Sequence, residues 1–335
     1  MKHANVAVFV PHNGCPHRCS FCDQRAITGQ AGQPSGEEVR RTAEAAAQTL
    51  RKSGCPAEFA FFGGSFTAVD PSYMETLLQS AAPFLKDGTF SGIRVSTRPD
   101  AVGEERLRVL RQYGVTAIEL GAQSMSDEVL QKNGRGHTAA DVRDAAARIR
   151  AFGFSLGLQM MTGLYGDTPE GARRTAKELI ALQPDTVRIY PTLVMRGTQL
   201  AEWYEAGSYR PQTLAEAVPL CAELLQWFEA AGISVIRVGL HSTPDLQKNL
   251  LAGPYHPAFR ELCESRIFRE QIAGLLRGKE PGDITIEVHP RDLSKAVGQR
   301  GENRDYFRKL GYSVQFLQND TVRTGECAIH QQEGR

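Results

Sequence analysis

Short runs of apolar and β-branched residues alternate along the first 240 residues with longer stretches in which apolar residues recur every three or four positions. The short runs predict seven strands at 6–10, 58–62, 93–98, 116–120, 155–161, 186–191 and 233–238. The amphipathic stretches between them predict helices, for example at 37–53, 104–114, 139–153 and 169–184. Repeated strand–helix order is typical of parallel βα units. We therefore predict an α/β fold with an open or closed βα barrel over residues 1–245.

Composition and charge set limits on the partners of the chain. The sequence has 335 residues, of which 41% are hydrophobic and 23% charged, and its formal net charge is +1. A near-neutral protein has no overall attraction to nucleic acid or membrane, so any basic surface must be local. No apolar run approaches the roughly 20 residues that span a bilayer, and the N-terminus lacks a signal-peptide core. We expect a cytoplasmic protein without a membrane partner.

The stretch GCPHRCSFCDQ, directly after the first predicted strand, contains Cys15, Cys19 and Cys22. In a reducing compartment such a group more often binds metal than forms disulfides. Structural zinc sites usually take four ligands, but the other four cysteines are scattered singly. A cubane iron–sulfur cluster held by three thiolates would keep one iron open for an outside ligand. A zinc site that uses flanking histidines remains an alternative.

The spacing Cys15-x3-Cys19-x2-Cys22, with Phe21 before the last cysteine, resembles the signature of the radical S-adenosylmethionine (SAM) superfamily. The resemblance implies a TIM-type barrel of the radical SAM type, full or partial. It implies a [4Fe-4S] cluster whose open iron binds S-adenosyl-L-methionine, and reductive cleavage of that cofactor to a 5'-deoxyadenosyl radical that abstracts hydrogen from substrate. It also implies an electron donor such as flavodoxin or ferredoxin.

Longer sequence motifs indicate which family within this superfamily the chain resembles. STRPD (96–100), residues 118–138, residues 160–170 and residues 187–211 are similar to the radical domain of the elongator catalytic subunit family, which modifies the wobble uridine of tRNA. The similarity extends from about residue 8 to residue 240. That family also carries an acetyltransferase-like domain, for which the roughly 95 residues after the barrel are too few. We therefore do not expect this chain to catalyse the carboxymethylation of tRNA that is known for that family.

The same resemblance implies a set of cofactor-binding residues at the strand ends, while the catalytic residue is unknown. Gly63, Gly64 and Ser65 would contact the methionine ammonium and carboxylate, and Arg98 would bind a carboxylate. Glu119 and Gln123 would lie near the ribose or the methionine part, and Met161 and Gly163 near the adenine. For each of these, a structural role is the alternative: a turn, a surface ion pair, a polar core network or core packing. Phe21, in the cysteine loop, would also contact the cofactor. Arg135 and His137 belong to the string NGRGHT, for which the sequence suggests no mechanism.

The C-terminal region has a different pattern. It predicts a strand at 284–290, a helix at 291–297, the turn GQRG at 298–301, a helix at 302–311 and a strand at 312–318. Two helices joined by GxxG between strands are typical of a KH-like module, in which the GxxG backbone binds single-stranded RNA. We thus divide the chain into a barrel (1–245), a helical linker (246–280) and a KH-like RNA-binding or capping domain (281–335).

A modest basic surface accompanies this turn, because Pro290 to Tyr312 contains six basic and three acidic residues. The candidate RNA-binding residues are Lys295, Gly298, Gln299, Arg300, Gly301 and Arg304. The favoured hypothesis is a radical SAM enzyme that modifies a nucleotide of tRNA or rRNA, that is, an RNA-modifying transferase. The alternatives are a radical SAM enzyme acting on a small molecule or porphyrin, and a non-catalytic cluster-binding or RNA-binding protein in ribosome biogenesis.

Overall fold

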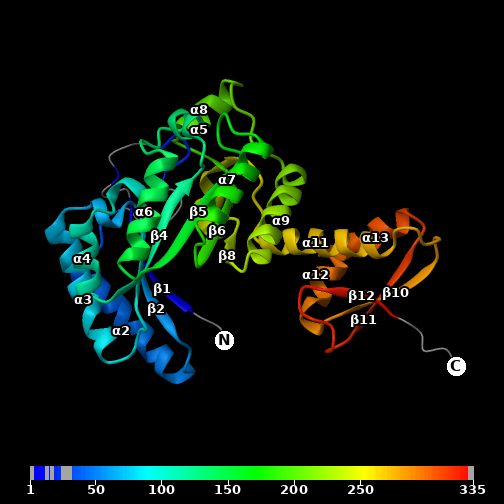
Figure 1. Cartoon of the computed structure of the whole chain (residues 1–335), viewed down its shortest axis with the longest axis horizontal. Coiled ribbons are helices and arrows are strands. Elements are labelled where there is room, and N and C mark those ends of the chain that lie inside the picture. The colour runs from blue at the N-terminus through cyan, green and yellow to red at the C-terminus, as the bar shows by residue number, and fades with distance from the viewer. Residues whose placement is uncertain (1–3, 12–14, 16–18, 24–31, 331–335) are drawn as a thin grey trace. The chain divides into compact units, whose positions relative to one another are not determined.

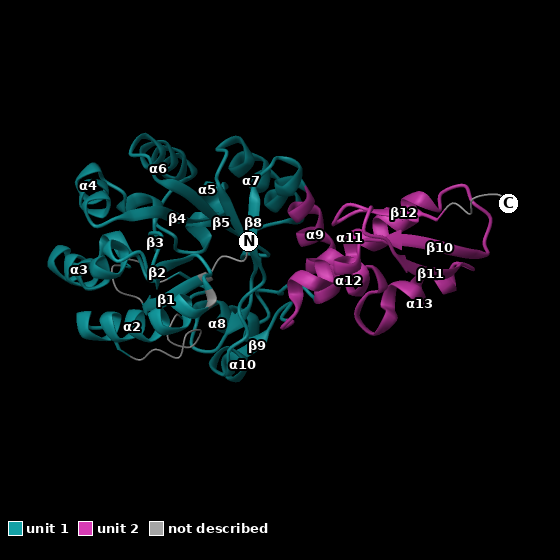
Figure 2. Cartoon of the chain, turned by 90° about the horizontal axis from the view of Figure 1, so that it is seen from below, with its two compact units in different colours: residues 1–213, 227–255 teal, residues 214–226, 256–335 magenta. Residues whose placement is uncertain are grey.

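The computed structural model describes residues 4–11, 15, 19–23 and 32–330. These residues form two compact units, which Figure 2 colours separately. Unit 1 comprises Met1–Thr213 and Trp227–Tyr255, and unit 2 comprises Leu214–Gln226 and His256–Arg335. Much of the segment that the sequence assigned to a linker (246–280) therefore lies within unit 2.

Unit 1 is built on a curled half-barrel of seven parallel strands in the order β1-β2-β3-β4-β5-β6-β8 (Figure 1). The strands are β1 (Ala4–Val10), β2 (Ala57–Gly63), β3 (Ile93–Thr97), β4 (Val115–Gln123), β5 (Ser155–Thr162), β6 (Thr186–Pro191) and β8 (Ser234–Val238). All seven coincide with strands predicted from the sequence, so the α/β barrel prediction is confirmed in its partial form. Because all strands run in one direction, their C-terminal ends lie along one rim, where ligands bind in such folds.

Helices cover the outer face of this sheet (Figure 2). They are α2 (Gly36–Ser53), α3 (Pro71–Lys86), α4 (Glu104–Gln112), α6 (Ala139–Ala151) and α7 (Pro169–Ala181). Local sequence explains where they begin: Ser35 with Glu38 and Thr138 with Asp141 form capping boxes that satisfy free backbone amides. Large side chains of β2 such as Phe59 and Phe61 are fully buried, and their burial stabilises the unit.

Several short elements of unit 1 were not predicted. They are η1 (Phe66–Ala68), η2 (Pro99–Ala101), α5 (Asp127–Lys132), β7 (Val194–Met195), α8 (Gln199–Glu205), α10 (Pro244–Asn249) and β9 (Leu250–Ala252). β7 and β9 form an antiparallel pair that joins segments far apart in the sequence. Elements this short carry little periodic pattern, and their pairing is decided by tertiary contacts.

Unit 2 contains a three-stranded sheet in the order β11-β10-β12, in which β10 (Asp283–Val288) pairs in parallel with β11 (Ser313–Gln318) and antiparallel to β12 (Cys327–Ile329). Its helices are α11 (Phe259–Leu275), α12 (Leu293–Val297), α13 (Glu302–Lys309) and most of α9 (Leu214–Ala230), with the short helices η3 (Pro290–Asp292) and η4 (Gln299–Gly301). Phe268, Ile272, Ile286 and Phe307 form its core. The predicted order strand, helix, GQRG, helix, strand is confirmed. Among the described residues, no helix is both long and apolar enough to cross a bilayer.

Candidate functional site

The three cysteines predicted to bind the cluster lie in the loop after β1. Cys15, Cys19 and Cys22 are free and partly buried, and the Cys22 amide donates to the Cys19 carbonyl at 3.1 Å. Among the described residues no group of three His, Cys, Asp or Glu side chains converges on a single ion. A cubane cluster does not require such convergence, because each thiolate binds a different iron.

Burial in the protein favours the protonated form of two of these thiols, Cys15 and Cys22. Burial raises the pKa of the Cys22 thiol, and the neighbouring Cys19 raises it further. Burial and then Cys19 likewise raise the pKa of Cys15. Ligation requires thiolates, so cluster assembly must release protons here.

Ser20, which lies between Cys19 and Phe21, connects the cysteine loop to other segments by hydrogen bonds. It is fully buried, and its amide donates to the carbonyl of Asn133 at 3.1 Å while its hydroxyl donates to the Asn133 side chain at 2.8 Å. The Ser20 carbonyl accepts from the amide of Leu200 in α8 at 2.8 Å. Residues over 100 positions away thus hold the backbone between Cys19 and Cys22.

Phe21 and Met161, both predicted to contact the cofactor, are brought together by the fold. Met161 is buried near the end of β5 in a cluster with Val129 and Leu164, against which Phe21 and Tyr190 pack. The apolar contact therefore joins the cysteine loop to the rim of the half-barrel. Contact of Phe21 with the cofactor, and of Met161 with its adenine, remains a prediction.

The end of β2 has the tight turn that the glycines suggested. Gly63 has φ +109°, and a Cβ placed there would lie 2.9 Å from the Val10 carbonyl oxygen, so only glycine fits. The amide of Gly64 donates to that same carbonyl at 2.7 Å. Ser65 is fully buried, and its hydroxyl lies 2.9 Å from the Thr97 hydroxyl and accepts from the Arg98 amide at 3.3 Å. The Ser65 side chain therefore links the ends of β2 and β3.

Arg98 lies at the end of β3 with 3% of its surface exposed. Its Nε donates to Asp100 at 2.9 Å, and its Nη2 donates to Asp100 at 3.1 Å and to the carbonyl of Arg135 at 2.5 Å. The remaining nitrogen, Nη1, is buried and has no hydrogen-bond partner within the described part of the chain. A buried donor of this kind is suited to an oxygen of a bound ligand.

Glu119 takes part in a buried ion network. Its carboxylate accepts from Arg188 at 2.7 and 2.9 Å and from Arg94 at 3.4 Å, and Arg94 also pairs with Glu58. This is the polar core network that the sequence left open as the alternative for Glu119. Its companion Gln123 has φ +66° and accepts from Gln159 at 3.1 Å. Contact of either residue with the cofactor remains a prediction.

Gly163, at the end of β5, is covered by the segment before α9. The Tyr209 hydroxyl donates to the Gly163 carbonyl at 2.6 Å. A Cβ on Gly163 would lie 2.7 Å from the Gln212 side chain, which also accepts from Thr162. Packing within the protein accounts for this glycine, and its predicted proximity to adenine is untested.

The loop between α5 and α6 was missed as part of the site. Arg135 donates from Nη1 to the sulfur of Cys19 at 3.1 Å, and His137 lies with Nε2 3.2 Å from the Ala122 carbonyl. Burial, followed by the charge of Arg135, lowers the pKa of His137 to about 4, so its imidazole is neutral. The only signal in the sequence was the distinctive string NGRGHT.

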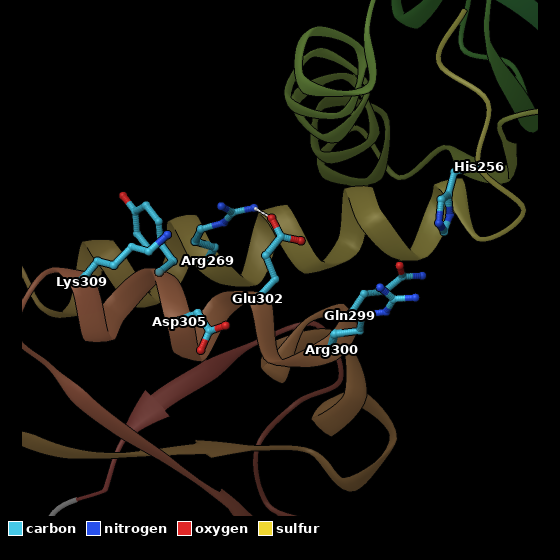
Figure 3. A pocket seen from close by; sticks show the side chains of 8 residues that line it. His256, Arg269, Gln299, Arg300, Glu302, Asp305 and Lys309 are labelled. Carbon is cyan, nitrogen blue, oxygen red and sulfur yellow. Dashed lines mark hydrogen bonds and ion pairs between the residues drawn. The ribbon is translucent and has the colours of Figure 1, made fainter.

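The GQRG turn of unit 2 connects α12 to α13. Gly298 and Gly301 have φ +78° and +80°, and Arg300 between them has φ +52°. Gln299 and Arg300 line one end of a pocket of about 610 Å³, and Figure 3 shows their side chains next to each other beside the turn. Arg269, Tyr306 and Lys309 line the remainder together with the acidic Glu302 and Asp305 and the more distant His256.

The remaining RNA-binding candidates occupy different environments. Lys295 is 3.1 Å from both Glu264 and Asp292, so its charge is already paired. Arg304 extends over the ring of Phe316 in β11 at 5.7 Å. Of the candidate cations, Arg300 and Arg304 are exposed, and Arg300 lies in the turn itself.

Comparisons with known proteins agree with this geometry. Residues 9–179 match the family described as Radical SAM superfamily, and residues 184–269 match the Radical_SAM C-terminal domain. Both matches end before β10. The sequence is 27% identical over 252 residues to a tRNA uridine(34) acetyltransferase of Dehalococcoides mccartyi (strain CBDB1), which covers 65% of this chain and 55% of that protein. It is 30% identical over 293 residues to Elongator complex protein 3 of Mus musculus, which covers 80% of this chain and 49% of that protein.

Solved structures share the fold. The archaeal Methanocaldococcus infernus Elp3 with an N-terminal deletion superimposes with a TM-score of 0.64 at 22% identity, covering 80% of this chain and 63% of that chain. Streptococcus suis SuiB bound to S-adenosylmethionine gives a TM-score of 0.52 at 12% identity, covering 70% of this chain and 49% of that chain. The chain spans about half the length of the curated relatives it matches.

Proposed function

Because the chain belongs to the radical SAM superfamily, we propose that it is an enzyme that modifies a nucleotide of RNA, most simply of tRNA. Members of this superfamily use a [4Fe-4S] cluster and S-adenosyl-L-methionine, which together supply a 5'-deoxyadenosyl radical that abstracts a hydrogen atom from substrate. An electron donor of the flavodoxin or ferredoxin class would supply the electron.

The residues of unit 1 fit these two groups. Cys15, Cys19 and Cys22 would each hold one iron. Arg98 Nη1 and Arg135 Nε are buried donors with no partner in the described part of the protein, and they would serve polar atoms of the cofactor. The turn at Gly63 and Gly64 packs against the Val10 backbone of β1, and we propose that it lies beside the methionine part of the cofactor.

The GQRG turn carries the RNA part of the proposal. At Gly301 no atom of the described residues lies within 4 Å of the position that a Cβ would take, so they leave this side of the backbone open to a ligand. Neighbouring Arg300 is exposed, and no ion pair to it occurs among the described residues. An open backbone next to a free cation suits the phosphate backbone of a single strand.

Charge pairing concentrates the free cations near this turn. The three acidic residues between Pro290 and Tyr312 each pair with a basic side chain: Asp292 with Lys295, Glu302 with Arg269 and Asp305 with Arg308. No ion pair is found in the described residues for Arg291, Arg300, Arg304 or Lys309. Unit 2 thus presents a local basic surface although the whole chain is nearly neutral.

The similarity to tRNA uridine(34) acetyltransferases and Elongator complex protein 3 favours tRNA as the substrate class. We propose that unit 1 receives the target nucleotide and that unit 2 binds the adjoining strand. The proposal covers modification of a nucleotide and leaves the added group open, because the chain spans about half of those relatives.

The test is an anaerobic turnover assay. The reconstituted protein would be reduced, supplied with S-adenosylmethionine, and assayed for 5'-deoxyadenosine with total tRNA, with rRNA and without RNA. We expect cleavage to rise with tRNA and a nucleoside of new mass to appear in its digest. Cleavage that is indifferent to RNA would point instead to a small molecule or porphyrin. No cleavage from a fully loaded cluster would favour a non-catalytic binding protein.

A further inference from the structure

The loop of residues 133–138, between α5 and α6, contacts two consecutive residues of the cysteine loop. Arg135 donates from Nη1 to Cys19 Sγ at 3.1 Å. Asn133 accepts from the amide and hydroxyl of Ser20. The proposed substrate needs neither contact, so they call for a separate explanation.

Arg135 is held rigidly in this position. Its Nη2 donates to the Gly121 carbonyl at 2.7 Å, its own carbonyl accepts from Arg98, and only 7% of its surface is exposed. Gly134 and Gly136 on either side have φ +63° and +68°, a left-handed backbone that other residues adopt at a cost. The string NGRGHT therefore builds a turn that presents one arginine to one sulfur.

Within the described part of the chain, the charge of Arg135 has no carboxylate partner. Arg98, its neighbour, pairs with Asp100, and Arg94 and Arg188 pair with Glu119. No carboxylate lies within ion-pair distance of Arg135 in the described residues, and its Nε has no hydrogen-bond partner among them. An uncompensated buried cation is costly, so the thiolates that a cluster requires are its natural counter-charge.

We propose that Arg135 is a positioning residue for the cluster, and that its hydrogen bond to the Cys19 sulfur raises the reduction potential of the cluster. Reduction adds one electron to a centre whose charge is partly carried by its sulfurs. A donor and a positive charge at one sulfur stabilise the reduced form more than the oxidised form. The proposal rests on membership of the radical SAM superfamily and is independent of the RNA substrate.

A purely structural role for Arg135 predicts something different. If the residue only ties the loop to the Gly121 carbonyl, replacing it would lower cluster retention but would leave the potential of the loaded fraction unchanged. The reduction potential therefore separates the two roles, whereas cofactor cleavage would not.

The experiment is a redox titration of the full chain followed by electron paramagnetic resonance, without S-adenosylmethionine or RNA. Iron and sulfide contents would confirm loading. Arg135→Gln removes the charge, Arg135→Lys keeps a charge with a single donor group, and Arg148→Gln is the matched control. Arg148 is an exposed arginine of α6, so its replacement changes net charge equally but at the surface.

We expect Arg135→Gln to make reduction at least tenfold less favourable, a fall of about 59 mV for one electron. Arg135→Lys should give an intermediate potential, and Arg148→Gln should match the wild type. A loaded Arg135→Gln cluster with unchanged potential would overturn the proposal. If that variant retains no cluster, Arg135→Lys decides alone: a lower potential than the wild type supports the proposal, and an equal one overturns it.

Discussion

Two loops in this chain place an arginine among glycines with left-handed backbone, and they differ in what surrounds it. In the loop of residues 133–138, Arg135 is buried and its guanidinium bonds to a sulfur and a carbonyl. In the GQRG turn, Arg300 is exposed, with backbone open beside it at Gly301. Similar local backbone therefore gives a buried, hydrogen-bonded arginine in unit 1 and an exposed arginine in unit 2.

The difference comes from the partners that the fold supplies. Arg135 contacts the Gly121 carbonyl of β4 and the Cys19 sulfur of the cysteine loop. Arg300 lies between two short helices at a surface pocket that also contains Arg269 and Lys309. Buried cations that are fixed in place can tune a single centre, whereas exposed ones contribute to phosphate affinity that depends on salt.

The largest effect should come from removing the sulfur that Arg135 contacts. Cys19→Ala should abolish formation of 5'-deoxyadenosine and reduce iron content, because one iron loses its protein ligand. The half-barrel should remain folded. Cys55→Ala, which replaces a partly buried cysteine outside the loop, should keep both iron and activity. Normal cleavage by anaerobically reconstituted Cys19→Ala would contradict the cluster assignment.

The two glycines of the GQRG turn should differ in how much their replacement by alanine destabilises unit 2. Gly298 combines φ +78° and ψ 161° with a Cβ position 2.9 Å from the Ser265 hydroxyl. Gly298→Ala should therefore cost unit 2 about 3 kcal/mol of stability. Gly301→Ala meets open space and should cost about 1 kcal/mol. Hydrogen exchange of the β10 and β11 amides would measure both, and equal losses would show that packing at Ser265 is unimportant.

The pH dependence of stability tests the burial of the 133–138 loop. The pKa of His137 is lowered to about 4 in the folded protein, against about 6.5 when unfolded. Below pH 6.5 the unfolded chain binds a proton that the folded protein does not, so stability is lost as pH falls from about 6.5 toward 4. Between pH 7.5 and pH 5 this amounts to about 2 kcal/mol.

His137→Gln should remove this component, because glutamine does not titrate. Urea unfolding of the wild type and the variant at pH 7.5 and pH 5 would give the difference in pH dependence, in which the contributions of all other titrating groups cancel. A His137→Gln variant with the same pH dependence as the wild type would mean that folding does not lower the pKa of His137.

The smallest effect should come from the exposed arginine. Replacing Gln299 and Arg300 with Asp should weaken tRNA binding by about tenfold or more at low salt and make affinity less sensitive to salt, because negative charge at the turn repels phosphate. Cleavage of S-adenosylmethionine without RNA should not change. Arg277→Asp alters an exposed cation after α11 and is the control. If Arg277→Asp weakens tRNA binding as much as Arg300→Asp alone does, the overall surface charge and not the GQRG turn determines the affinity for tRNA.

Much of the candidate site could be predicted because it lies in contiguous motifs at strand ends. The cysteine triad follows β1, the glycine turn follows β2 and Arg98 follows β3, and parallel strands bring such ends to one rim. Glu119 was harder to interpret, since its position on β4 suits both a ligand contact and the ion network with Arg188 and Arg94 that the structure contains. Lys295 similarly looked free in the sequence but is paired with Glu264 and Asp292.

By itself, the sequence determined the seven parallel strands, the covering helices, the cysteine spacing and the GQRG turn between two helices, because each of these depends on residues close together in the chain. Only the tertiary structure decided that Arg135 donates to Cys19, 116 residues away, and that Asn133 holds Ser20. It also decided which of the cations are paired and which are not. Contacts between distant segments depend on how the elements pack, and hydrophobic periodicity carries no information about which polar groups will meet.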